Sequence, residues 1–205
     1  INPVAVHTAN LEHPGVSLGA EALKTWEQTA TTEQPGSMAA KTLKVILPQT
    51  IPSPGEVKSI LNEYTPKLRS EDVGERRLAA FQCDWAEAAL DGLEREPKPE
   101  LEVEVQAIRL GDAVLVAHPA ELFAEFGVDV KARSPFKNTT VVGYANNFIG
   151  YVADEDDYER GGSWGLGGYA STLAPRICGL FPFRPDAGRI LADAMVEAVE
   201  EVASA

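Results

Sequence analysis

The sequence predicts an α/β protein whose mixed, largely parallel sheet is flanked by helices. The runs 113–118 and 139–144 are short and rich in valine, and a helical segment joins them. This arrangement is typical of neighbouring parallel strands in a covered sheet. Gly111-Asp112 lies between two strand patterns and indicates a hairpin, which makes the sheet mixed. With 205 residues and 44% hydrophobic content, the chain can hold one sizeable domain.

The first half of the chain alternates helical and strand patterns. Ser17 suits the N-cap of the first predicted helix, and Pro35-Gly36 marks a loop before the first strand. Apolar residues at helical spacing and, near residue 103, at alternate positions define the other elements. The predicted elements are a helix over 17–30, a strand over 42–47, a helix from residue 54, a helix over about 71–93 and a strand over 101–105.

In the second half, the hairpin leads into the strand over 113–118, and a Pro-Ala-Glu turn follows before a helix. The strand over 139–144 ends in Gly-Tyr. The chain closes with a predicted helix over 186–202, which has apolar residues on one face. Its apolar stripe consists of Ile190, Leu191, Ala194, Met195 and Ala198.

Composition excludes several classes of partner. The chain has 18 Lys and Arg against 31 Asp and Glu, a formal charge of −13, which opposes contact with nucleic acid or anionic lipid. No apolar run approaches the roughly 20 residues that a transmembrane helix needs. Cys83 and Cys178 are the only cysteines, and they do not indicate a disulfide framework. Whether they pair stays open.

Glu121 and Tyr151 each follow a predicted strand. Ligands of open α/β sheets bind at the carboxyl edge of the strands, so a carboxylate and a phenol from distant sequence are expected to converge there. Taken alone, each residue also has a structural interpretation. Glu121 suits the first turn of a helix, and Tyr151 suits a packed ring with its hydroxyl at the surface. His118, at the end of a strand, either lines the same pocket or is a structural residue.

The segments GDAVLVAHPAE and NNFIGYVADEDDY resemble the later part of the catalytic domain of the neutral/alkaline ceramidase family, zinc amidohydrolases that cleave an N-acyl bond. The family's Pro-Gly-Glu corresponds to Pro119-Ala120-Glu121, and its Asn-x-x-x-x-Tyr corresponds to residues 146–151. The resemblance implies that Glu121 and Tyr151 are ligands of Zn²⁺. It also implies that residues 1–205 form the C-terminal half of such a catalytic domain.

In that family, a further tyrosine, about a dozen residues after the zinc-binding tyrosine, helps to hold the substrate carbonyl. Ser163 stands at that spacing here, whereas Tyr169 fits after a short insertion. The resemblance therefore favours Tyr169 as the catalytic oxyanion donor. Trp164 lies in the same glycine-rich loop and is expected to form an aromatic wall for substrate, because loops on a rigid scaffold carry recognition. The family's Glu after this tyrosine is missing, which leaves the amide substrate open.

Ile1-Asn2-Pro3 resembles the tail of a segment in the middle of the family's catalytic domain, and the family's two zinc-binding histidines lie before it. His7, His13 and His118 match neither histidine motif. The resemblance thus implies a processed enzyme, whose fold is completed by a missing N-terminal half. That half is expected to be another chain of the same precursor, which donates the histidines. The alternative is a non-catalytic α/β subunit that binds a partner or small ligand. The cellular compartment is not indicated.

Overall fold

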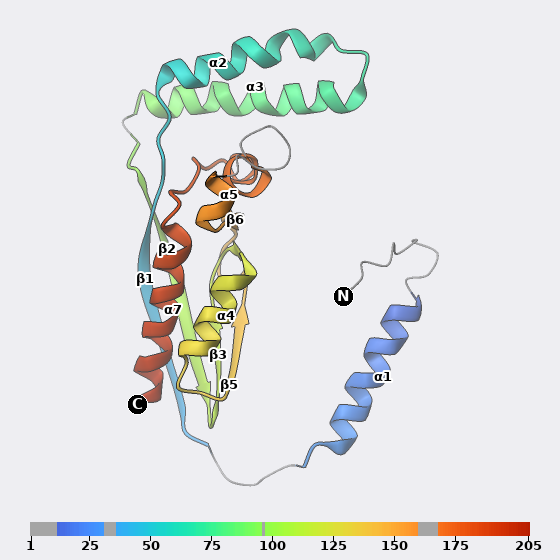
Figure 1. The fold of residues 1–205 in the computed structure, drawn as a ribbon, viewed down its shortest axis with the longest axis vertical. Coiled ribbons are helices and arrows are strands. Elements are labelled where there is room, and N and C mark those ends of the chain that lie inside the picture. Colours follow the sequence, from blue (N-terminus) through green and yellow to red (C-terminus); the bar gives the residue numbers. More distant parts are fainter. Residues whose placement is uncertain (1–11, 31–35, 96, 160–167) are drawn as a thin grey trace. The chain divides into compact units, whose positions relative to one another are not determined.

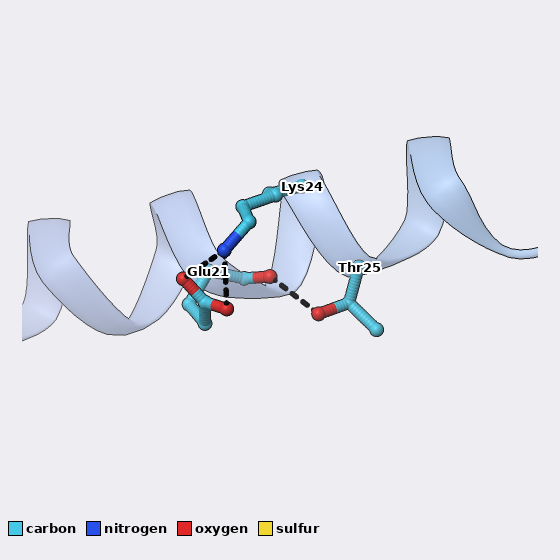
Figure 2. Close-up of polar contacts among 3 residues, drawn as sticks. All are labelled: Glu21, Lys24 and Thr25. Carbon is cyan, nitrogen blue, oxygen red and sulfur yellow. Dashed lines mark hydrogen bonds and ion pairs between the residues drawn. The ribbon is translucent and has the colours of Figure 1, made fainter.

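The computed structural model describes residues 12–30, 36–95, 97–159 and 168–205, and it divides into two compact units at Pro35. The described element of the first unit is helix α1, Glu12–Gln28. Figure 2 shows its polar contacts: Lys24 Nζ lies 3.0 Å from Glu21 Oε1, and Thr25 Oγ1 donates to the Glu21 carbonyl at 2.8 Å. The predicted N-cap was wrong, because Ser17 lies inside α1. The helix begins at Glu12. Pro14 therefore lies in its first turn, where proline is tolerated.

The second unit is built on a four-stranded sheet with the order β1-β2-β3-β5. Its strands are β1 Met38–Pro48, β2 Glu100–Leu110, β3 Ala113–Ala117 and β5 Asn138–Val142. The pairs β1–β2 and β2–β3 are antiparallel, and β3–β5 is parallel. The α/β class and the mixed sheet are confirmed, as are the hairpin at Gly111, which has φ 64°, and the parallel neighbours.

The parallel part of the sheet is smaller than the sequence predicted. The connection from β1 to β2 contains two long helices, α2 Pro54–Tyr64 and α3 Val73–Leu93, which lie side by side (Figure 1). An outgoing and a returning helix bring the chain back to the end of the sheet that it left. Pro48 therefore pairs with Glu100, and β2 must run antiparallel to β1.

The helical pair is fixed by its caps and by its contact with the rest of the unit. Ser53 and Glu56 form a reciprocal capping box at the start of α2, and the Asp72 side chain caps α3. The Trp85 ring of α3 meets the Phe181 ring edge-on, with centroids 6.4 Å apart.

Cys83 and Cys178 are both free thiols. Among the described residues, no helix is both long and apolar enough to span a bilayer.

Helices α7 Ala187–Ala203 and α4 Ala124–Arg133 pack on one face of the sheet (Figure 1). The final helix thus lies where the sequence predicted it. Strand residues alternate between this core and the opposite face, as the pleat requires. The largest buried core residues include Leu47, Val105, Val114, Val116, Ile149, Phe183, Leu191 and Met195.

Gly188 marks the tightest packing between α7 and α4. A Cβ at this position would collide with the Phe126 ring and would lie 3.2 Å from the Ala153 carbonyl oxygen. Gly188→Ala is therefore expected to lower the free energy of unfolding by about 1–3 kcal/mol, the usual cost of overpacking a core. Urea denaturation measures this change. Gly127→Ala in α4 is the matched control, since nothing lies within 4 Å of its Cβ. That control should be neutral or stabilising by up to about 1 kcal/mol, and equal losses in both variants would contradict the packing argument.

A second, two-stranded sheet lies beyond the end of β3. It consists of β4 Glu121–Leu122 and β6 Tyr151–Val152, which run parallel. Glu121 therefore does not open a helix, as the sequence suggested, because α4 begins only at Ala124. The chain between β6 and α7 contains α5 Glu155–Glu159, a π-helical turn Tyr169–Leu173 and α6 Ala174–Ile177.

Candidate active site

Strands β4 and β6 place Glu121 and Tyr151 next to each other. The two residues are register partners in a parallel pair, so their side chains lie on the same face of the sheet. The Glu121 amide donates to the Gly150 carbonyl at 2.9 Å, and the Phe123 amide donates to the Val152 carbonyl at 3.2 Å. Gly150 has φ 72°, a conformation that favours glycine. The structure thus brings together the carboxylate and the phenol that sequence analysis placed at the carboxyl edge.

An open pocket of about 330 Å³ lies at this edge. One wall comes from the turn that joins β3 to β4, and the other comes from the end of β5 and the start of β6. The pocket is lined by His118, Ala120, Glu121, Leu122, Val141, Gly143, Tyr144 and Tyr151.

Tyr144 is a pocket residue that sequence analysis did not single out. Its hydroxyl donates a hydrogen bond to Glu121 Oε1, and this bond is the main reason why the pKa of Tyr144 is raised to about 12. Its ring is stacked on Phe148, with centroids 5.6 Å apart and planes 10° apart. The sequence did contain a signal that could have identified Tyr144. Gly143-Tyr144 follows a predicted parallel strand, so it lies at the same sheet edge as Glu121.

Tyr169 lies against Tyr151. Their ring centroids are 5.8 Å apart at an interplanar angle of 69°, and 45% of Tyr169 is exposed. Gly168, the residue before Tyr169, has φ 83°, and a Cβ on Gly168 would collide with the Ser171 hydroxyl. The negative charge of Glu121 is the main cause that raises the pKa of Tyr151. The three predicted site residues therefore form one cluster, whereas Ser163 and Trp164 lie outside the described residues.

His118 is 3% exposed and forms part of the pocket wall. Its Nδ1 accepts a hydrogen bond from the Ala120 amide at 3.3 Å, so the ring proton of the neutral form resides on Nε2. Burial lowers the pKa of His118 to about 4, which keeps the ring neutral at pH 7. The bond to Ala120 holds the turn that leads into Glu121, in line with a structural role.

Glu121 and Tyr151 offer a carboxylate and a phenol on the same face of the β4–β6 sheet, and a carboxylate oxygen is a usual ligand of zinc. Catalytic zinc usually takes three protein ligands drawn from nitrogen, oxygen and sulfur. Within the described ranges, no group of three or more His, Cys, Asp or Glu side chains could hold a metal. The described residues therefore do not form a complete zinc site by themselves, and they offer oxygen donors for part of one at most.

The fold and the pocket define an α/β domain with a carboxylate and phenols at the carboxyl edge of a mixed sheet. No protein-family model matches the chain, and no curated protein matches it in sequence. The solved structures that share its fold include two ceramidases. A ceramidase complexed with C2 has a TM-score of 0.55 and 18% identity, covering 99% of this chain and 36% of that one. A neutral ceramidase from Pseudomonas aeruginosa has a TM-score of 0.52 and 18% identity, covering 97% of this chain and 33% of that one.

The fold is therefore ceramidase-like, and the resemblance read from the sequence is confirmed at the level of the fold. The chain spans about a third of the length of these structures, 36% and 33% respectively. At 18% identity the likeness concerns the fold alone, because one fold can serve many activities.

Proposed function

We propose that this chain is part of a zinc-dependent, ceramidase-like hydrolase that cleaves an N-acyl or related amide bond. The observation that carries the proposal is the pairing of Glu121 with Tyr151 in β4 and β6. Resemblance to the family marked these two residues as zinc ligands from separate motifs, 30 positions apart in the sequence. A shared register on one face of a sheet places the two side chains side by side, as two ligands of one metal could be placed.

The predicted site residues have distinct parts in the proposed reaction. Bound zinc would provide a Lewis acid and a water whose pKa falls towards about 7. Glu121 and Tyr151 would hold the metal. Tyr169, whose ring lies against that of Tyr151, would donate a hydrogen bond from its hydroxyl to the oxyanion that develops as the carbonyl is attacked. His118, whose Nδ1 accepts a hydrogen bond from the Ala120 amide, would stabilise the turn that leads into Glu121.

The proposal includes a second polypeptide section from the same precursor, which donates two histidines to the metal. Two observations support it. No group of three or more His, Cys, Asp or Glu side chains among the described residues could hold a metal by itself, and the chain corresponds to about a third of the length of the ceramidase structures. The substrate would be a small-molecule amide that binds where the two sections meet.

Purification of the assembled protein tests this function. Mass spectrometry is expected to find a second polypeptide from the same precursor, and metal analysis is expected to find zinc. Chelation should abolish hydrolysis of N-acyl amides, and added zinc should restore it. A homogeneous 22.0 kDa species that binds zinc and turns over substrate alone would contradict the second section. An assembly without zinc or amidase activity would instead favour a non-catalytic subunit.

A further inference from the structure

Tyr144 lies in the pocket but belongs to neither the proposed ligands nor the proposed oxyanion donor. Its hydroxyl donates to Oε1 of Glu121 and leaves Oε2 for a metal. We infer that Tyr144 is a positioning residue, which fixes the Glu121 carboxylate in the orientation that binds zinc. This inference rests on the proposed zinc site and adds a residue that is not a ligand.

The backbone at Tyr144 is held in an unusual conformation. Its φ is 57°, in the left-handed region that bulky side chains rarely adopt. Such conformations persist where the surrounding structure enforces them, and they cluster at functional sites. Here the next amide, that of Ala145, donates to the His118 carbonyl at 3.0 Å. This bond ties the turn after β5 to the turn before β4.

The turn that carries Tyr144 is in close contact with the turn that leads into Glu121. A Cβ on Gly143 would lie 3.0 Å from the Ala120 carbonyl oxygen and 3.6 Å from the His118 ring. Glycine at 143 therefore lets the two turns approach each other. Backbone packing in this way sets the separation of the main chains of Tyr144 and Glu121, from which the phenol and the carboxylate meet.

The Tyr144 ring is also restrained, although 60% of the residue is exposed. An exposed hydrogen bond usually contributes little because water competes for both partners. Stacking on Phe148 limits the positions of the Tyr144 ring, so that less side-chain freedom is lost when the bond forms. The bond in turn limits the rotation of the Glu121 carboxylate. Groups that hydrogen-bond to metal ligands orient those ligands in the same manner.

A different role is also conceivable for the same contact. The Tyr144 hydroxyl would act as a lock if it occupied the space that the metal needs, and its removal would then strengthen zinc binding. The positioning role predicts the reverse. Measured zinc affinity therefore separates the two roles by the sign of the change.

The test compares Tyr144→Phe with Phe148→Leu in the assembled protein, by competition for zinc with a chromophoric chelator. Tyr144→Phe keeps the ring and removes the hydroxyl, and it should weaken zinc binding by about 10–100-fold, the typical effect of losing a group that orients a ligand. The thermal unfolding midpoint of the zinc-free protein should stay unchanged. Phe148→Leu keeps the hydroxyl and should weaken zinc binding less. Tyr144→Asn, which suits left-handed backbone, should lose as much affinity as Tyr144→Phe.

Turnover provides a second readout. At saturating zinc, Tyr144→Phe should recover its turnover, because the variant retains every proposed zinc ligand. Unchanged or tighter zinc binding in this variant would overturn the positioning role, as would turnover that stays low at saturating zinc. If the unaltered assembly binds no zinc, the proposed function fails together with this inference. If the unaltered assembly binds zinc and the variant binds it equally well, only the inference fails.

Discussion

Glu121→Gln is expected to abolish hydrolysis and to weaken zinc binding by more than about 100-fold. Loss of a group that merely orients a ligand already costs about 10–100-fold, and here the ligand itself loses its charge. The fold should persist, because glutamine is nearly isosteric with glutamate and its side-chain oxygen can still accept a hydrogen bond from the Tyr144 hydroxyl. The β4–β6 pairing uses the backbone of residue 121 and does not depend on its side chain.

Zinc titration and steady-state kinetics on the assembled protein measure these effects. Glu125→Gln is the matched control, since it makes the same chemical change in the first turn of α4 and does not line the pocket. The control should bind zinc and turn over substrate normally. Full zinc occupancy with near-normal turnover in Glu121→Gln would show that the ligand assignment is wrong.

Tyr169→Phe should lower turnover by about 100-fold while zinc content stays unchanged. One hydrogen-bond donor to a developing oxyanion typically contributes this much, and the donor is only needed once charge develops on the carbonyl oxygen. The ring contact with Tyr151 is retained by phenylalanine, so the position of the proposed ligand should not change. The expected signature is a fall in kcat with little change in KM.

Tyr158→Phe is a suitable control for this prediction. It removes the same group from a tyrosine of α5 whose buried hydroxyl has no hydrogen-bond partner in the described part of the chain. Turnover of the control should match that of the unaltered protein. Normal turnover in Tyr169→Phe would remove Tyr169 from the mechanism and return Ser163, or a group from the second section, to consideration. Trp164, proposed from sequence as a substrate wall, stays a prediction because its segment is not described.

Sequence patterns located most of the helices and strands of the second unit. The alternation in 101–105 and the valine-rich runs 113–118 and 139–144 indicated strands, because one face of each strand meets the core. Element boundaries were less reliable. Ser17 was assigned as an N-cap although the helix continues past it to Glu12, since a cap preference is weak beside the other determinants of a helix start.

The direction of β1 relative to β2 required the tertiary structure. Both strands could be read from their residues, but their antiparallel pairing follows from the helical pair that returns the chain to the same end of the sheet. A local pattern carries no information on where a long connection ends. The parallel share of the sheet was overestimated for this reason.

The sequence by itself determined the α/β class, the resemblance to ceramidases and the choice of Glu121, Tyr151 and Tyr169 as site candidates. These conclusions depend on residue types and spacing along the chain. Only the tertiary structure decided that Glu121 belongs to a short strand paired with Tyr151, and that Tyr144 donates to its carboxylate. Strands of such length have no periodicity to detect, and a left-handed φ at a tyrosine opposes local preference. Both depend on contacts between segments distant in sequence, the backbone bonds between β4 and β6 and the close approach of Gly143 to Ala120, which no local pattern contains.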